Sequence, residues 1–485
     1  MRAREIALRH ARSVPTLMRI IQNAPMAVAA SRIGRLALPG GAVLLAAAVG
    51  LLAGREPGLA VAAALGVAFM LITLANLYVG LVLFTGLAFI VEVPELGGSA
   101  VSFAKVSGLL LGISWLAVVT TRGYTRAAFP SAHPAISYLV VLFLSWIAIS
   151  QLWAESSAEA LDTLLRLSLN LVLAMVIFTA VRKPGQAIGL AAAFVAGATI
   201  NAIYGLLFVE PEGTETAVRL ASGIANPNEL ATILVAALTL ALGLAAALRG
   251  SPILRFGAFA ATAVCLAGVF LTGSRGGLVA LGVALIAFLV IGSRFRGRVL
   301  VVAVAIIASG VSYYNYVASP EARGRITDVE SGSGRTDLWE VGWRMVEAQP
   351  IRGVGGGNFE VVSPSFLLEP GAIERPEFFL TSAPKVAHNS YLEIWAELGA
   401  VGLVLFLSIL AFGVVAAGRA TRAFVRLGDL KMEALSRAVF VAFAAVMAAD
   451  FFGSRQYDKE LWFLLGLAAA LWAIARRQET GALSE

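Results

Sequence analysis

The sequence has one cysteine, three histidines and few charged residues. A single cysteine, Cys265, excludes an intramolecular disulfide, so any polar segment must be ordered by packing and hydrogen bonds. Three scattered histidines without neighbouring cysteines make no zinc site. Charged residues make up only 14% of the 485 residues and hydrophobic residues 59%, with a mean hydropathy of +0.84. This composition excludes an ordinary water-soluble globular protein and indicates a polytopic helical membrane protein.

The first 35 residues are basic and partly apolar. They carry seven arginines against one acidic residue, Glu5, with isoleucine, leucine and methionine between them. This pattern is typical of a segment at the membrane interface, and no compact apolar core with a small-residue cleavage site follows the early arginines, as a cleavable signal peptide would require. The arginines flank apolar segments and are not interleaved with stacking aromatics. The net charge of +7 is therefore interpreted as membrane orientation, and no nucleic-acid partner is expected.

Apolar runs of helical length recur along the chain. We count about fourteen, at residues 36–54, 58–73, 75–92, 103–121, 133–153, 160–181, 184–209, 226–248, 252–271, 275–292, 298–317, 389–417, 433–453 and 458–476. The run from Gly58 to Val91 is continuous, and its length predicts a hairpin near Asn76. The expected fold is all-α: a polytopic integral membrane protein with about 12–14 transmembrane helices and one large extracytoplasmic loop.

The predicted organisation has five parts. They are a basic cytoplasmic or interfacial segment (1–35), a transmembrane bundle (36–317), a large outer loop (318–388), three C-terminal transmembrane helices (389–476) and a cytoplasmic tail (477–485). Alternate connections are rich in arginine and lysine, and several of the others are acidic. The positive-inside rule then places both termini inside and the large loop outside. We expect a multi-pass protein of the bacterial cytoplasmic (inner) membrane whose active site faces the periplasm or exterior.

The large loop contains readable local structure. Asp337, followed three residues later by Glu340, predicts a helix N-terminus, and Pro350 predicts that this helix ends soon after Ala348. The next segment, residues 353–359 (the glycine-rich loop), matches neither a G-x-G-x-x-G fingerprint nor a Walker motif, so no nucleotide site is expected.

One histidine and three arginines are the candidate functional groups of the outer side. His10 and His133 fall on the cytoplasmic side, which leaves His388, whose neutral imidazole near physiological pH can accept a proton from a hydroxyl nucleophile. Next to it, Asn389 is a predicted helix N-cap. A surface or capping histidine is the alternative for any histidine taken alone.

The arginines favour an anionic ligand. Arg275 begins an apolar run between glycines, Arg219 lies in a loop that leads into a helix, and Arg335 precedes the predicted surface helix. Helix N-termini with neighbouring guanidinium groups favour phosphate, although each arginine by itself is more often structural. Outside the membrane no nucleotide sugar is at hand, so a transferase there needs a donor such as a polyprenyl diphosphate-linked glycan, which carries its own activation.

Five motifs occur in an order that resembles the O-antigen ligase and polymerase superfamily. They are RLASGIANPNELA at 219–231, TGSRGG at 272–277, GRTDLW at 334–339, PIRGVGGGNF at 350–359 and HNSYLEIWAELGAVG at 388–402. The resemblance spans residues 200 to 475. It implies an inverting, metal-independent transfer without a cofactor, with His388 as the base. It further implies that Arg275 and Arg335, and with them Arg219 and Asn228, bind the lipid diphosphate.

Several alternatives stay open at this point. The acceptor can be a lipid A core (ligase), another lipid-linked repeat (polymerase, which the number of segments favours) or a protein (oligosaccharyltransferase), and a chain-length regulator is a further candidate partner beside membrane lipids. A lipid-linked glycan flippase would also need outer arginines, but it would need polar residues through the depth of the bilayer, and the inner halves of the segments are nearly free of charge. A cell-wall polymerase of another family would instead use an outer acid such as Asp328, Glu330 or Glu347.

Overall fold

The computed structural model describes residues 50–51, 53–88, 103–121, 129–208, 219–222, 226–291, 296–327, 335–367 and 386–481. These residues are nearly all helical and contain no β-strand. The helices are Pro57–Ala75 (α4), Leu77–Leu87 (α5), Phe103–Thr121 (α6), Phe129–Ala132 (α7), Pro134–Ser150 (α8), Ser157–Ala180 (α9), Pro184–Phe208 (α10), Pro227–Ala247 (α11), Pro252–Leu271 (α12), Arg275–Ile291 (α13), Arg296–Ser312 (α14), Tyr313–Val317 (η3, a π-helix), Pro320–Thr327 (α15), Arg335–Ala348 (α16), Phe359–Leu367 (α17), Ser390–Leu427 (α19), Leu430–Ala449 (α20), Asp450–Phe452 (η4) and Lys459–Glu479 (α21).

These boundaries follow the apolar runs of the sequence closely. The expected hairpin near Asn76 is confirmed, because Asn76 separates α4 from α5 and its side chain accepts the N–H groups of Tyr78 and Val79 at 3.1 and 3.3 Å. The helix expected from Asp337 begins two residues earlier, at Arg335, so Asp337 lies in its first turn and is not its cap. The basic segment 1–35, nearly all of the run 36–54, Asp328 and Glu330 lie outside the described residues.

The protein is an all-α polytopic membrane protein. Seven described helical segments are long and apolar enough to cross a membrane: α9, α10, α11, α12, residues 300–317, α19 and α20 with η4. Shorter apolar helices add to them within α4, α5, α6, α8 and α13. Helix α21, which carries Lys459 and Glu460 at its start and Arg476 and Arg477 at its end, is not among the seven.

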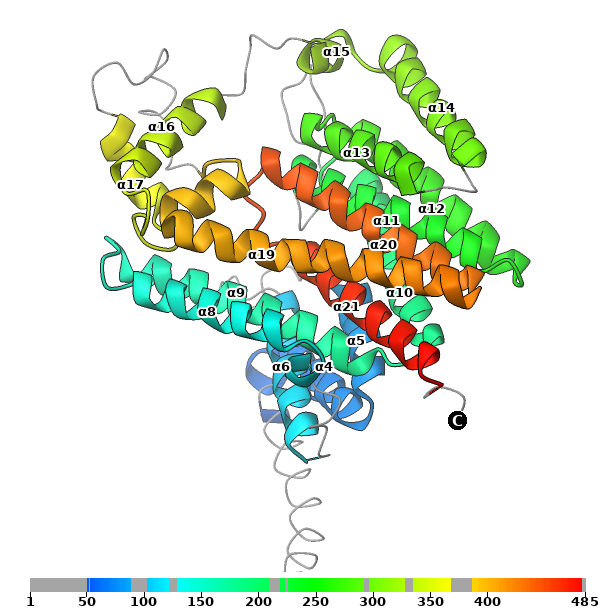
Figure 1. Cartoon of the computed structure of the whole chain (residues 1–485), viewed down its shortest axis with the longest axis horizontal. Coiled ribbons are helices and arrows are strands. Elements are labelled where there is room, and N and C mark those ends of the chain that lie inside the picture. The colour runs from blue at the N-terminus through cyan, green and yellow to red at the C-terminus, as the bar shows by residue number, and fades with distance from the viewer. Residues whose placement is uncertain are drawn as a thin grey trace, which may run out of the picture. The chain divides into compact units, whose positions relative to one another are not determined.

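The chain divides into two compact units. The smaller comprises residues 1–68 and 94–100, of which the structure describes 50–51 and 53–68, mainly the first part of α4. The larger comprises residues 69–93 and 101–485 and holds all candidate functional residues. In this unit α11 packs against α12 and α20, α19 packs against α20 and α21, and α21 packs against α9 (Figure 1). The apolar segment of α11 is 89% buried and that of residues 300–317 only 17%, so α11 is central and α14 lies at the periphery.

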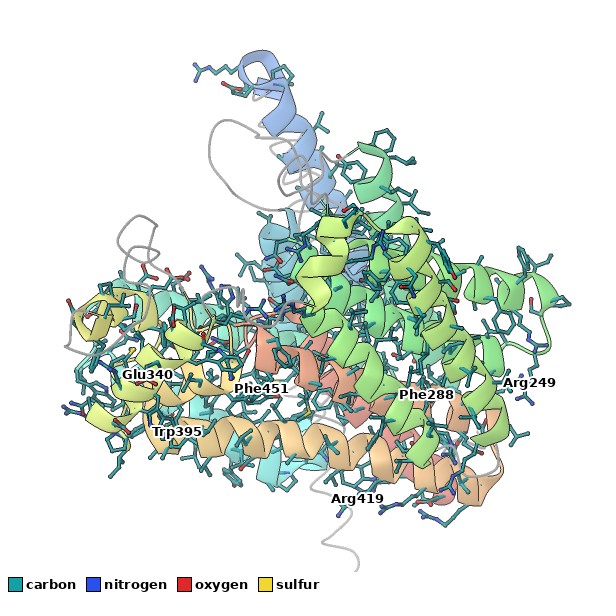
Figure 2. The ribbon with its side chains drawn as sticks, turned by 90° about the horizontal axis from the view of Figure 1, so that it is seen from above. Arg249, Phe288, Glu340, Trp395, Arg419 and Phe451 are labelled. Carbon is teal, nitrogen blue, oxygen red and sulfur yellow. The ribbon has the colours of Figure 1, made fainter. Side chains whose placement is uncertain are left out.

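The two ends of the larger unit differ in chemistry. At one end Arg437 pairs with Glu433 at 3.1 Å, and Arg426 at the close of α19 pairs with Glu479 at the close of α21 at 2.6 Å. Figure 2 shows Arg249 and Arg419 toward this end, and Glu340 and Trp395 at the other. The opposite end of the unit holds the first turns of α9 and α19 and the start of α21.

At that end α19 is kinked, and the glycine-rich loop packs against the kink. Gly399 has φ of 67° and ψ of −172° inside α19, which interrupts the helical hydrogen-bond ladder. The N–H groups of Val354 and Gly355 donate to the freed carbonyls of Ala396 and Glu397 at 3.0 and 2.8 Å. Backbone here packs on backbone with no room for side chains, which explains the glycines without invoking a phosphate.

Asn358 attaches the glycine-rich loop to the start of α9, and its replacement by alanine is expected to destabilise the protein. The fully buried carboxamide accepts from Ser156 N at 2.7 Å and donates to the carbonyls of Ser156 and Gly356 at 3.1 and 2.8 Å. Leaving these buried groups unpaired should lower the free energy of unfolding by about 2–4 kcal/mol. Unfolding in detergent measures this, with Asn315→Ala at an exposed position as control; equal stability of the two variants would contradict it.

Candidate functional site

Arg219, Asn228 and the α12–α13 turn form one hydrogen-bonded cluster. Arg219 donates from Nε to the Thr272 carbonyl at 2.8 Å and from Nη2 to Asn228 Oδ1 at 3.0 Å. The Ser274 hydroxyl donates to the same Asn228 oxygen at 2.9 Å. Asn228 therefore holds Arg219 and the turn in place, and the turn leads directly into Arg275.

Arg275 is the first residue of α13. Ser274 precedes it and its Oγ accepts the Gly277 N–H at 3.2 Å, which caps this helix. Gly276 allows η4 to come close, because a Cβ at Gly276 would lie 3.1 Å from Phe452 Cβ. The start of α13 thus combines a helix N-terminus, whose dipole favours anions, with two guanidinium groups, those of Arg219 and Arg275.

Arg335 begins α16, which reaches the same place from the loop side. Trp339, one turn after Arg335, has its ring centroid 5.5 Å from that of Phe451 and 6.5 Å from that of Phe452. Residues four apart share a helix face, so Arg335 lies on the side of α16 that turns toward η4. The starts of α13 and α16 therefore both approach the Phe451–Phe452 pair, of which Phe451 is labelled in Figure 2.

His388 reaches this segment from α19. Its neighbour Asn389 caps α19 as expected, accepting from Tyr391 and Leu392 N–H at 3.0 and 3.2 Å. Ser390 N donates to the Gly453 carbonyl at 3.0 Å, and Gly453 directly follows Phe452. His388 is half-buried and has φ of 51°, the one positive φ at a non-glycine position among the described residues. Such a backbone marks a position held by its surroundings and is frequent at functional sites.

Glu393 is the group that holds the His388 backbone. The carboxyl group of Glu393 is buried and accepts from Ala387 N at 3.0 Å and from Gln456 Nε2 at 2.6 Å, and it also hydrogen-bonds to the Ser454 hydroxyl. One side chain therefore ties the residue before His388 to the segment after Gly453. The Glu393 carboxyl group therefore holds the backbone directly before His388.

The connection between α20 and α21 is polar and buried, and this segment (residues 450–458) is the meeting point of the other elements. Asp450 and Arg455 are 1% and 5% exposed, and the carboxylate of Asp450 interacts electrostatically with the guanidinium of Arg455. The Asp450 oxygens have no hydrogen-bond partner among the described residues. Burial raises the pKa of the Tyr457 hydroxyl, and the carboxyl groups of Glu397 and Glu393 raise it further.

A second polar feature, the acidic cavity, opens beside this segment. It measures about 390 Å³ and is lined by Glu159, Asp162, Thr163, Arg166, Gly357, Phe359, Glu360, Val361, Val386, Glu393, Glu397 and Tyr457. Five of these residues carry a carboxyl group and one a guanidinium. Partial burial raises the pKa of Glu360, the neighbouring Glu159 raises it further, and Arg166 opposes both. Asp162 and Arg166, four residues apart in α9, form an ion pair at 2.5 Å in the cavity wall.

Sequence reasoning found only part of this site. The structure joins Arg219 directly to Asn228 and places both next to Arg275, while Arg335 and His388 approach the same 450–458 segment through Trp339 and Ser390. Sequence motifs had not singled out Glu393 or predicted the acidic cavity. The available signal was the pair Glu393 and Glu397, four residues apart at the head of an apolar run, together with Glu159, Asp162 and Arg166 on one face of another.

Comparison with known proteins gives one finding. Residues 260–407 match the family model described as O-antigen ligase. This stretch contains Arg275, Arg335, Glu393 and His388, and it ends before the 450–458 segment. No curated protein gives a match to the chain.

Proposed function

We propose that this membrane protein, whose residues 260–407 match the O-antigen ligase family model, belongs to that superfamily and transfers a glycan from a polyprenyl diphosphate to an acceptor hydroxyl. The observation that carries this proposal is the convergence of His388 with the arginine-bearing starts of α13 and α16 on the 450–458 segment. A base and an anion site side by side are what such a transfer needs.

The diphosphate is assigned to the arginine side of the site. Arg219 is fixed by the Thr272 carbonyl and by Asn228, and Arg275 is the first residue of α13, three residues after Thr272, so little ordering remains when an anion binds. Arginine binds phosphate oxygens in a bidentate manner, and such charged hydrogen bonds strengthen as negative charge grows on the leaving group. Arg335 adds a third guanidinium from α16.

An apolar groove supports the polyprenyl part of the donor. It measures about 420 Å³ and lies between α13, α14 and η3, with apolar walls and with Tyr314, Asn315 and Arg323 among its lining residues. The Tyr314 hydroxyl donates to the Phe270 carbonyl at 3.3 Å, and Tyr314 is within electrostatic range of Arg219. An isoprenoid chain in this groove would therefore have its diphosphate end near Arg219.

His388 then acts as general base. An imidazole nitrogen takes the proton of the acceptor hydroxyl while its oxygen attacks the anomeric carbon, and the bond from that carbon to the diphosphate oxygen breaks. The diphosphate leaves with the bonding electrons, held by the arginines, and attack opposite the leaving group inverts the anomeric centre. The imidazolium later returns its proton to water.

The site is proposed to face the extracytoplasmic side. Arg419, Arg422, Arg426 and Arg437 lie at the opposite ends of α19 and α20, as the positive-inside rule requires of cytoplasmic ends. Transfer in proteoliposomes that hold the lipid-linked donor tests the function as a whole, and the length distribution of the product separates a polymerase from a single-transfer ligase. A protein that gives no product with any lipid-linked donor would contradict the proposal.

Removing the guanidinium groups is expected to weaken donor binding. Arg275→Gln and Arg335→Gln each remove a charged hydrogen-bond donor, and each loss should reduce donor affinity about 10- to 100-fold. Titration of lipid-linked donor into protein in nanodiscs measures this. Arg352→Gln is the matched control, because Arg352 is exposed at the same end and its Nε bonds Gln349 Oε1 at 3.1 Å. Undiminished donor affinity in the double variant would remove the arginines from the site.

A further inference from the structure

The acidic cavity is poorly suited to the diphosphate of the proposed donor, and its lining fits a different ligand. The cavity lining has five carboxyl groups and one guanidinium, and that guanidinium, Arg166, is already paired with Asp162 at 2.5 Å, so the lining offers a phosphate little attraction and contrasts with the arginine side of the site. We propose that the cavity binds the acceptor saccharide, and that it selects sugars with free hydroxyl or amino groups over acidic sugars. This inference rests on the proposed function, since it assigns the second substrate of the same transfer.

The chemistry of the lining argues for a ligand rich in hydrogen-bond donors. Carboxyl oxygens accept hydrogen bonds, most strongly when the group is ionised, and sugar hydroxyls and ammonium groups donate them. The Tyr457 ring supplies a flat apolar surface and a hydroxyl that lies 3.4 Å from that of Thr163. In the part of the chain that the structure describes, no group of three or more histidine, cysteine or acidic residues is arranged to hold a metal ion. A volume of about 390 Å³ is in the range of small-molecule sites.

Glu397 provides the second and independent observation. It is 2% exposed and lines the cavity. Its Oε1 accepts the Phe359 N–H at 3.1 Å, but Oε2 has no hydrogen-bond partner among the described residues. A buried polar atom without a partner is costly and rare in folded proteins. A sugar hydroxyl, which can both donate and accept a hydrogen bond, would supply the missing partner whether the Glu397 carboxyl group is ionised or neutral.

The position of the cavity fits an acceptor site next to the base. Val386 and Glu393 line the cavity, and the Glu393 carboxyl group accepts the N–H of Ala387, the residue between Val386 and His388. The cavity wall and the His388 backbone are thus the same short segment of chain. A sugar bound in the cavity would contact Val386, two residues before His388. The arginines lie on the other side of the 450–458 segment.

Direct binding of three disaccharides of matched size tests this. Cellobiose is neutral, the β-1,4-linked glucosamine disaccharide is cationic at pH 6.5, and cellobiouronic acid is anionic. Binding to the full-length protein in nanodiscs is followed by saturation-transfer NMR and titration calorimetry, without donor. The expected order of affinity is amino over neutral over acidic, with about tenfold between the first and the last.

Two substitutions locate the binding. Glu397→Gln at the depth of the cavity and Glu360→Gln at its exposed edge should each lower affinity for the glucosamine disaccharide about tenfold and leave donor affinity unchanged. Glu360 is exposed, so Glu360→Gln should fold normally. It tests binding in the cavity even if Glu397→Gln fails to fold. Glu340→Gln is the control, since Glu340 lies on α16 outside the cavity and pairs with Arg344 at 3.3 Å.

The outcomes separate this inference from the proposed function. Absence of saturable binding, equal or tighter binding of the acidic disaccharide, or insensitivity to both cavity substitutions would each overturn the acceptor site. None of these binding measurements requires lipid-linked donor or glycan transfer. If transfer is absent but the disaccharides bind in the expected order and respond to Glu360→Gln, the cavity is a saccharide site and the transferase proposal alone is lost.

Discussion

Replacing His388 by alanine is expected to lower the rate of glycan transfer by about 10²- to 10⁴-fold, the usual contribution of a general base. The acceptor hydroxyl would then lose its proton to water, while the arginines still bind the diphosphate. We therefore expect the loss in kcat, with the affinity for lipid-linked donor unchanged. Single-turnover transfer and donor titration on the same nanodisc preparation measure the two quantities separately.

The backbone at His388 calls for two further variants. At φ of 51° an alanine is itself strained, so part of the loss could come from a shifted loop. Asparagine tolerates this left-handed conformation and glycine adopts it freely, yet neither offers a base. His388→Asn and His388→Gly should therefore be as inactive as His388→Ala but as stable as the unaltered protein. Normal turnover in either of them would remove His388 as the base.

Replacing Gly399 by alanine is expected to have the largest effect on folding. Gly399 has φ of 67°, and a Cβ there would collide with the Ile351 carbonyl oxygen. Left-handed backbone strain and overpacking against a rigid main chain together should lower the free energy of unfolding by about 3–5 kcal/mol. The kink also orients the turn that carries Glu393 and Glu397, so the folded fraction should bind acceptor sugars poorly. Thermal unfolding in detergent and expression level measure the first effect.

Gly428 is the matched control for this substitution. It ends α19 with φ of 70°, but a Cβ at Gly428 would meet no other heavy atom within 4 Å. Gly428→Ala therefore carries the left-handed strain without the collision, and about 1 kcal/mol is expected. A similar loss of stability for both variants would mean that the contact of the glycine-rich loop with the kink contributes little.

Local sequence signals were sufficient for the helices and for single site residues. Membrane-length apolar runs predict helices because unsatisfied backbone groups are costly in lipid, and this rule placed α9 to α13 within a few residues of their boundaries. Asn76 and Asn389 were predicted as helix breaks or caps from side-chain chemistry that acts over two or three residues. No motif predicted that the glycine-rich loop packs on the α19 kink, because this contact joins residues about forty positions apart.

The sequence by itself was sufficient to predict an all-α membrane protein, to show a resemblance to the O-antigen ligases, which the family model matches over residues 260–407, and to name His388, Arg219, Arg275 and Arg335 as candidate groups. Only the tertiary structure decided that Asn228 holds Arg219, that Glu393 fixes the backbone before His388, and that carboxyl groups from α9, α17 and α19 line one cavity. The physical reason is range: hydropathy and capping act between neighbours in the chain. The bonds from Ser274 to Asn228 and from Gln456 to Glu393, and the cavity shared by α9, α17 and α19, instead join residues tens to hundreds of positions apart, and no pattern within one segment specifies its partner.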